Sequence, residues 1–401
     1  DDAAVELFVE RARSESEYEP DATDLAVIGE ICRRLDGIAL AIELAAARVR
    51  SMSPTQVRDR LDERFRLLTG SRRSIERHQT LRHAVQWSYD LLEPAEQVVL
   101  QQVSVFVGGF DLDAAAVIGG LDEYEALDIL DSLVRKSLLH VDRVDSAVRY
   151  YMLETIRQFA EEALAAAGNS DEIRDRHAGY FADRADDAVG RYMTVDELGV
   201  AKWVDLEMAN LTAGFHWALS RGLADTAVRI AAIHDIARDS LRTDTFEWPE
   251  QVLALARHVE HRQLPCLLAL ACDAATGTGR PEDGVRYGLE AIALNDDLRY
   301  DFDYAAYYRT AMAMFVLGDV DRAVRTVRVG AEHPADQPVR ANLLYLHVLI
   351  HLAGIGIPEP ESLAAISHLQ ASPMPAIRAG GFWVQANLVA DRDAPAAIAL
   401  Y

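Results

Sequence analysis

Apolar residues recur every three or four positions along most of the chain, which is the spacing of amphipathic helices. Between Gln79 and Ala160, three such helical patterns precede two short strand-like segments and one further helix. This order is typical of a winged helix, with Asp128–Leu139 in the position of the recognition helix and Leu138–Tyr151 as the wing. We therefore predict a mainly α-helical chain with a winged helix and a short β-wing in its first half.

Helical patterns also flank this stretch on both sides. Before it, short helices on short loops predict a compact bundle, in which Ser53 caps a helix and Pro54 takes its first position. Beyond it, helix pairs repeat, and the turn glycines Gly279 and Gly318 are 318 − 279 = 39 residues apart. Tetratricopeptide repeats have a period of ~34 residues, so the pairs resemble degenerate repeats of that type, and other helical-hairpin arrays remain open. The predicted segments are a helical domain at 1–75, the winged helix at 76–165, a connecting helical region at 166–240 and tetratricopeptide-like repeats at 241–401.

The apolar face of the predicted recognition helix contains Leu127, Leu130, Leu133 and Val134 at helical spacing. Its polar face is roughly neutral, and is made of Asp128, Asp131, Ser132, Arg135 and Lys136. Gln79–Ala160 as a whole has 6 Lys and Arg against 13 Asp and Glu. A surface that binds nucleic acid phosphates should be basic, so the charge favours a winged helix that packs on protein or covers a ligand. DNA binding remains the alternative.

Composition narrows the class of protein further. The net charge of −24 argues against nucleic acid or an anionic membrane as a general partner, with one locally basic stretch at Arg48–Arg77. The three cysteines are too few and too irregularly spaced for a disulfide framework or a zinc site. Without a signal sequence or a long apolar run, we expect a cytoplasmic protein.

Several residues could suggest chemistry or binding. His347 and His351 have the spacing of a zinc-protease pair, but Val348 stands where that motif needs glutamate, and His258 and His261 lack a third ligand nearby. No catalytic constellation is evident, so we predict a chain that is not an enzyme. Trp203 and Trp217 are 217 − 203 = 14 residues apart, can share one helical face, and are expected in the core.

Five segments carry a family resemblance: LDGIALAIELAAARV, RHQTLRHAVQWSYDLL, SVFVGGFDLDAAAVI, LVRKSLL and YYMLETIRQFAEEAL. In this order they resemble the NB-ARC ATPases of the STAND signalling class, in particular the AfsR-like and LuxR-type regulators of actinobacteria. In those proteins an ATPase core precedes a helical domain, a winged helix and tetratricopeptide-like repeats. Some members also have a nucleotide-cyclase domain or a C-terminal LuxR helix-turn-helix.

The resemblance implies a nucleotide-facing edge in two places. The family's GLPL turn, which approaches adenine, corresponds to Gly37, Ile38, Ala39 and Leu40, with Ala39 where proline is usual. The family's phosphate-sensing histidine corresponds to Leu153, followed by Glu154. Leucine cannot donate a hydrogen bond, so phosphate sensing at that position is not expected from Leu153 itself. The alternatives are that Gly37–Leu40 joins two core helices and that Leu153 is a core residue.

The chain has no GxxxxGK[ST] motif, and both of its ends fall within helical patterns, so we expect a fragment that lacks the P-loop subdomain. We therefore predict no cofactor in this chain, and ATP or ADP in the parent protein. The predicted role is a sensor fragment of an ATP-dependent transcriptional regulator, with the winged helix as a nucleotide-gated lid and hinge. The expected partners are the upstream ATPase domain, a protein or small-molecule effector in the repeat groove, and further copies on activation, without direct contact with nucleic acid or membrane. The alternatives are a DNA-binding module, a plain repeat scaffold, and an enzyme with an unrecognised site.

Overall fold

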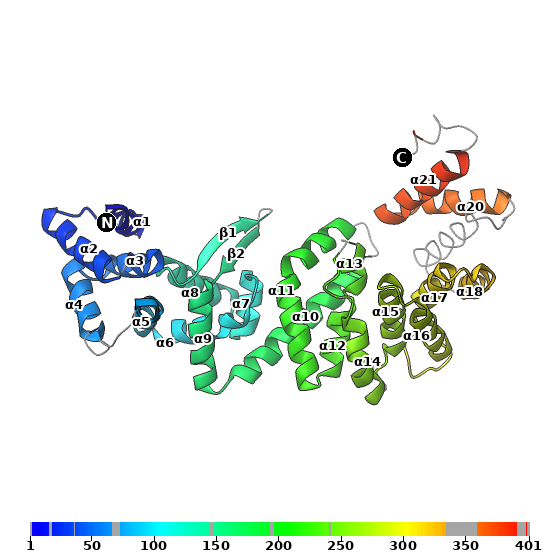
Figure 1. The fold of residues 1–401 in the computed structure, drawn as a ribbon, viewed down its shortest axis with the longest axis horizontal. Coiled ribbons are helices and arrows are strands. Elements are labelled where there is room, and N and C mark those ends of the chain that lie inside the picture. The colour runs from blue at the N-terminus through cyan, green and yellow to red at the C-terminus, as the bar shows by residue number, and fades with distance from the viewer. Residues whose placement is uncertain are drawn as a thin grey trace. The chain divides into compact units, whose positions relative to one another are not determined.

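The structure is a computed structural model in which the chain divides into two compact units, Asp1–Tyr180 and Phe181–Tyr401 (Figure 1). It describes residues 2–15, 18–35, 37–65, 73–144, 147–192, 196–239, 242–333, 359–390 and 398. The division falls within helix α10 (Ser170–Tyr192). The predicted segments 1–75 and 76–165 lie in the first unit and 241–401 in the second, whereas 166–240 extends into both.

The first unit begins with a small helical bundle. Its elements are α1 (Asp2–Glu15), α2 (Ala22–Arg34), α3 (Ala39–Ala46), the 3-10 turn η1 (Ala47–Arg50) and α4 (Pro54–Phe65). The Asp21 side chain caps α2 by accepting hydrogen bonds from the N–H groups of Thr23 and Asp24. The apolar helix α3 packs against α1, and its buried residues join Phe8 and Ile28 in the core.

The predicted winged helix follows in the expected order. Its elements are α5 (Arg73–Asp90), α6 (Pro94–Gln102), η2 (Val103–Val105), α7 (Leu112–Gly119), α8 (Glu123–Arg135), β1 (His140–Val144), β2 (Ala147–Tyr151) and α9 (Glu154–Ala167). The wing pairs in antiparallel register from His140 opposite Tyr151 to Val144 opposite Ala147. The recognition helix α8 begins at Glu123 rather than Asp128 because Asp122 caps it, accepting hydrogen bonds from the N–H groups of Tyr124 and Glu125. It ends at Arg135, so the prediction that it continued to Leu139 was wrong.

A close backbone contact holds the wing to the helices. Phe110 forms an isolated antiparallel bridge with Tyr150 and so extends the two-stranded sheet by one pair. Gly109, just before it, has φ +86°, and a Cβ there would lie 2.5 Å from the ring of Tyr151. The buried guanidinium of Arg149 donates a hydrogen bond to the Gly109 carbonyl at 3.1 Å. Only glycine fits this position without strain.

The second unit is a series of antiparallel helical hairpins. After the second part of α10 it contains α11 (Glu197–Arg221), α12 (Ala224–Ala231), α13 (His234–Asp239), α14 (Trp248–His258), α15 (Leu264–Gly277), α16 (Pro281–Leu294), α17 (Ala305–Val316), α18 (Val320–Glu332), α20 (Glu359–Gln370) and α21 (Pro375–Ala390). Helix α15 packs on α16 and α17, and α17 on α18 (Figure 1). Gly279 (φ +81°) lies in the turn between α15 and α16, and Gly318 (φ +80°) lies in the turn between α17 and α18. Both were predicted as turn residues, and their positive φ angles favour glycine.

These features confirm the predicted fold class, which is mainly α with a helical bundle, a winged helix and a tetratricopeptide-like helical array. No helix among the described residues is both long and apolar enough to cross a membrane. His347 and His351, the pair with the spacing of a zinc-protease motif, lie outside the described residues.

Candidate functional site

The recognition helix α8 packs through Ala126, Leu130 and Leu133, which are buried. Leu127, expected on the same apolar face, is 42% exposed, and Tyr124 is 81% exposed. The exposed surface of α8 also carries four carboxylates, on Glu123, Glu125, Asp128 and Asp131. The side of the helix that a winged helix would insert into a DNA groove is therefore acidic and partly apolar.

Both cations of α8 and its C-cap are paired with carboxylates. Arg135 forms an ion pair with Asp131 one turn earlier. Lys136 forms an ion pair with Glu96 on α6, and the Ser132 hydroxyl donates to the same carboxylate oxygen of Glu96 at 2.6 Å. Burial alone would raise the pKa of Glu96, but hydrogen bonds from Lys136, Ser132 and the Glu93 N–H outweigh it and leave that pKa lowered.

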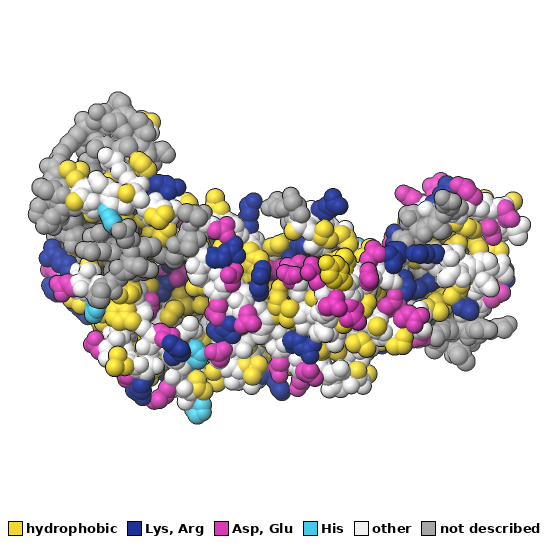
Figure 2. All heavy atoms as spheres, turned by 180° about the vertical axis from the view of Figure 1, so that it is seen from behind, with side chains coloured by type: hydrophobic (Ala, Val, Ile, Leu, Met, Phe, Trp, Pro, Cys, Tyr) yellow, Lys and Arg dark blue, Asp and Glu magenta, His cyan; other side chains and the backbone are white. Residues whose placement is uncertain are grey.

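The wing adds little positive charge of its own. Val141, Asp142 and Arg143 of β1 are exposed, as are Ala147 and Val148 of β2, and the other wing arginine, Arg149, is buried against Gly109. On the face drawn in Figure 2, the described Lys and Arg side chains lie among Asp and Glu over most of the surface. Among the described residues, α8 and the two strands of the wing therefore present no basic face, which winged helices that bind DNA usually have.

The residues predicted at the nucleotide edge lie at the starts of two helices. Gly37 has φ +68° and is exposed, Ile38 is the N-cap of α3, and Ala39 and Leu40 form its first turn. Leu153 is the N-cap of α9, and neither N-cap makes a side-chain capping bond, so backbone N–H groups at both helix starts lack a side-chain partner from these residues.

Leu153 is 43% exposed, so the alternative that it is a core residue was wrong. Glu154 begins α9 and accepts hydrogen bonds from Arg157 at 2.8 Å, which hold the pKa of Glu154 below its ordinary value. Helices α3 and α9 both pack against α5, but no hydrogen bond or ion pair joins Gly37–Leu40 to Leu153 or Glu154, all of which are described. Their role at a nucleotide stays a prediction.

The second unit contains a cluster of charged side chains around a buried arginine that sequence reasoning missed. Arg309 on α17 is 6% exposed and forms an ion pair with Asp235 on α13, and its Nη1 lies 4.0 Å from Asp303 Oδ2. Asp235 Oδ1 lies 3.9 Å from Arg238, whose Nη1 donates to Asp273 on α15 at 2.6 Å. We call these five residues the Arg309 cluster. It joins helices α13, α15 and α17 across 74 residues of sequence.

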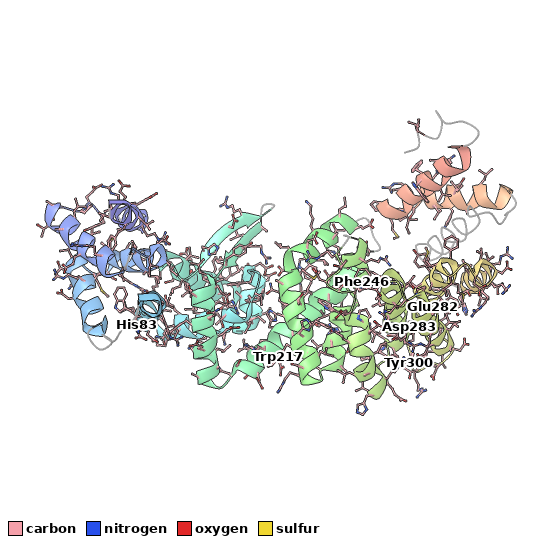
Figure 3. All side chains as sticks on the ribbon, viewed as in Figure 1. His83, Trp217, Phe246, Glu282, Asp283 and Tyr300 are labelled. Carbon is pink, nitrogen blue, oxygen red and sulfur yellow. The ribbon has the colours of Figure 1, made fainter. Side chains whose placement is uncertain are left out.

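Burial and charge act against each other within the Arg309 cluster. Burial would raise the pKa of Asp273, but His234 and Arg238 outweigh it and hold that pKa well below its usual range. Burial raises the pKa of Asp303, and Arg309 opposes that rise only in part. The His234 ring packs edge-on against Phe246, which is labelled in Figure 3, with ring centroids 5.2 Å apart. The Nδ1 atom of His234 lies 3.0 Å from the Thr245 hydroxyl. Nothing in the sequence pattern distinguishes these residues from solvated helix positions.

The other predicted positions in the second unit have ordinary surroundings. Trp203 and Trp217 are both half-buried, so the expectation that they are core residues was wrong. His258 is exposed, and His261 lies 3.3 Å from Asp225. Among the described residues, no group of three or more His, Cys, Asp or Glu side chains is arranged to hold a metal ion.

Comparisons with known proteins agree with the winged helix. Residues 92–165 match the family model described as a winged helix-turn-helix domain. The chain is 43% identical over 239 residues to the Mycobacterium tuberculosis protein Rv0890c, which is named provisionally as an HTH-type transcriptional regulator, and this match covers 58% of the chain and 26% of that protein. It is 42% identical over 180 residues to the uncharacterized M. tuberculosis protein Rv0894, covering 43% of the chain and 46% of that protein.

The chain therefore spans about a quarter of the length of the regulators it matches. Among solved structures, it is similar to a signal transduction ATPase with numerous domains (STAND) protein with a tetratricopeptide repeat sensor from Pyrococcus horikoshii. That likeness has a TM-score of 0.42 and 14% identity, and covers 86% of this chain and 56% of the other. At these values it carries no conclusion about fold or function.

Proposed function

We propose that this chain is a sensor part of a transcriptional regulator, in which the winged helix contacts protein rather than DNA. The observation that carries this proposal is the exposed surface of α8, with four carboxylates and with both neighbouring cations paired to carboxylates. Neutralisation of phosphates by Lys and Arg supplies a large share of the affinity of a DNA-binding protein, and it requires available cations. Exposed Tyr124 and Leu127 fit a protein contact, because aromatic and apolar side chains are enriched at the centres of such interfaces.

The second part of the proposal concerns nucleotide gating in the longer protein. In it, a P-loop ATPase domain binds ATP or ADP, and the starts of α3 and α9, with Gly37, Ile38, Ala39, Leu40, Leu153 and Glu154, lie at the nucleotide's edge. Helix N-termini suit such a role because their free N–H groups attract phosphate. Nucleotide exchange would move the winged helix as a lid, and release would permit oligomerisation in the cytoplasm. The resemblance of the five sequence segments supports this part.

The third part assigns partner binding to the second unit. Stacked helical hairpins form extended curved surfaces that bind peptides, proteins or small effectors. A plain scaffold without a switch would have the same hairpins. The two differ in whether partner binding changes when nucleotide binds the upstream domain, which affinity measurements on the longer protein with ATP and with ADP would show.

Direct DNA binding is the second candidate function, and the match of residues 92–165 to the winged helix-turn-helix domain favours it. The test is fluorescence anisotropy of a labelled random-sequence duplex of about 30 bp with the 401-residue chain, at about 50 and 200 mM salt. We expect no saturable binding below about 100 µM protein at either salt, since nonspecific DNA binders reach about 1–100 µM. A dissociation constant near 1 µM that weakens at least about tenfold at the higher salt would overturn the proposal.

A further inference from the structure

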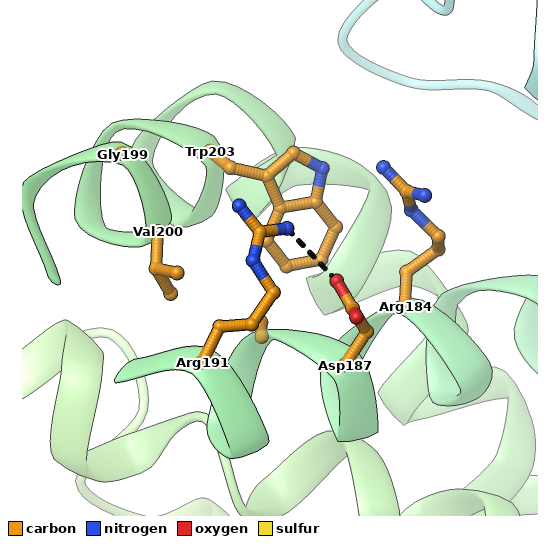
Figure 4. A pocket seen from close by; sticks show the side chains of 7 residues that line it. Arg184, Asp187, Arg191, Gly199, Val200 and Trp203 are labelled. Carbon is orange, nitrogen blue, oxygen red and sulfur yellow. Dashed lines mark hydrogen bonds and ion pairs between the residues drawn. The ribbon is translucent and has the colours of Figure 1, made fainter. Parts of the chain in front are cut away.

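A small pocket opens in the second unit, between the second part of α10 and the first turns of α11 (Figure 4). Its volume is about 230 Å³, and Arg184, Asp187 and Arg191 of α10 and Gly199 and Trp203 of α11 line it. Sites for drug-sized ligands usually have ~300–1,000 Å³, so this pocket limits a ligand to about one or two fused rings.

The two arginines of the pocket differ in their partners. Arg191 forms ion pairs with Asp187, at 3.0 Å, and with Asp196, so its charge is already balanced. The guanidinium of Arg184 lies over the ring of Trp203 at 5.9 Å from the centroid. No carboxylate among the described residues forms an ion pair with Arg184, although the chain has 64 Asp and Glu against 40 Lys and Arg. Among the described residues, Arg184 therefore has an aromatic ring rather than an ion-paired carboxylate as its neighbour.

These features specify the ligand that would fit. The half-buried indole of Trp203 offers a flat apolar surface, and flat rings stack on it with a gain beyond simple burial. The guanidinium of Arg184 is planar and suits a carboxylate, with which it can form two parallel hydrogen bonds. We propose that this pocket binds a small planar aromatic carboxylate, whose ring lies along Trp203 and whose carboxylate pairs with Arg184.

This proposal goes beyond the proposed function, because it assigns a ligand class to the second unit whether or not α8 binds DNA. The two can fail separately, since one is tested with DNA and the other with small molecules. The pocket would make the α10–α11 hairpin a site for an aromatic acid effector.

The experiment is calorimetric titration of the full chain with 2-naphthoate, with its neutral amide 2-naphthamide, with the saturated acid cyclohexanecarboxylate and with inorganic phosphate. We expect saturable binding of 2-naphthoate, and at least about tenfold weaker binding of the other three, because the amide lacks the charge and the other two lack the flat ring. Arg184→Gln and Trp203→Leu should each weaken 2-naphthoate binding about tenfold or more.

The matched control is Arg221→Gln. Arg221 lies over the ring of Trp217, which is labelled in Figure 3, at 5.6 Å from the centroid, and both residues belong to α11. Neither residue lines the pocket. This variant should bind 2-naphthoate as the unchanged chain does. The proposal is overturned if 2-naphthoate does not saturate at millimolar concentration, if the amide binds equally well, or if Arg221→Gln weakens binding as much as Arg184→Gln. Should Arg184→Gln fail to fold, the discrimination of acid from amide by the unchanged chain decides.

Discussion

The Arg135–Asp131 pair on α8 and the Arg309 cluster both pair arginine with carboxylates, but the first is exposed to water and the second surrounds a buried guanidinium. Arg135 and Asp131 on α8 have side chains 41% and 56% exposed, whereas the side chain of Arg309 is 6% exposed. An exposed ion pair contributes little to stability because water screens it, while breaking a buried pair leaves an uncompensated charge. We therefore expect the charges on α8 to affect which partners bind it, and the charges of the cluster to affect the packing of α13, α15 and α17.

The Lys136–Glu96 pair of the winged helix is also largely shielded from water. The side chains of Lys136 and Glu96 are 24% and 8% exposed. This pair connects α8 to the start of α6, so it holds the recognition helix in place and also removes a cation from its surface. Glu96 and Arg309 are each buried beside a partially exposed partner, since the side chain of Lys136 is 24% and that of Asp235 31% exposed. The expected cost is smallest for the exposed pair and largest for Arg309, because both Asp235 and Asp303 lose a counter-charge with it.

The largest effect is expected for Arg309→Met. The change removes the counter-charge of Asp235 and Asp303 inside the second unit, and the free energy of unfolding should fall by about 3–5 kcal/mol. Urea unfolding of the full chain, followed by circular dichroism, measures it. The control is Arg262→Met, since Arg262 pairs with Asp301 at the surface and should cost below about 1 kcal/mol. Equal costs for the two variants would contradict the comparison.

An intermediate effect, dependent on pH, is expected for Glu96→Gln. At neutral pH it should cost about 1.5–3 kcal/mol, because it removes hydrogen bonds from Lys136 and Ser132 to a charged group. The folded pKa of Glu96 is lowered, so its stabilisation is present above the unfolded pKa of about 4.3 and is lost as pH falls through the folded pKa. The free energy of unfolding should therefore become equal for the unchanged chain and Glu96→Gln as the pH is lowered below about 4. If the difference in the free energy of unfolding between the two chains stayed constant with pH, the ionised carboxylate of Glu96 would not be the source of the stabilisation.

The smallest effect is expected for Arg135→Gln. Asp131 and Arg135 are one helical turn apart on the exposed surface of α8, and such pairs stabilise a helix by about 0.2–0.5 kcal/mol. The loss should shrink further in high salt, which unfolding at low and high ionic strength would reveal. A loss above about 1 kcal/mol would place this pair with the buried ones instead.

Local patterns in the sequence predicted more of the fold than of the sites. Helical spacing and the turn glycines Gly279 and Gly318 predicted the bundle, the winged helix and the hairpins, because these depend on neighbours in sequence. The start of α8 was placed too late, although Asp122 is a recognisable N-cap.

The charged contacts could not be predicted from the sequence because they join residues that are far apart along the chain. Lys136 and Glu96 are 40 residues apart and Arg309 and Asp235 are 74 apart, so no periodicity relates them. The acidity of α8 was visible from Asp128 and Asp131, but not the pairing that neutralises Lys136. The pocket was missed for a similar reason, because Arg184 and Trp203 come from different helices and Trp203 has the spacing of a core residue.

The central claim is that α8 does not read DNA, and the most direct test is the salt dependence of DNA affinity in a matched pair. The unchanged chain is compared with Asp128→Lys/Asp131→Lys, which replaces two exposed carboxylates with cations and frees Arg135 from its partner. The measured quantity is the slope of log affinity against log salt, which is about −0.9 for each phosphate neutralised. We predict that the unchanged chain shows no saturable DNA binding from which a slope can be fitted below about 100 µM protein, and that the variant binds with a slope of about −1 or steeper. A slope of about −4 or steeper for the unchanged chain, with no change in the variant, would contradict the account.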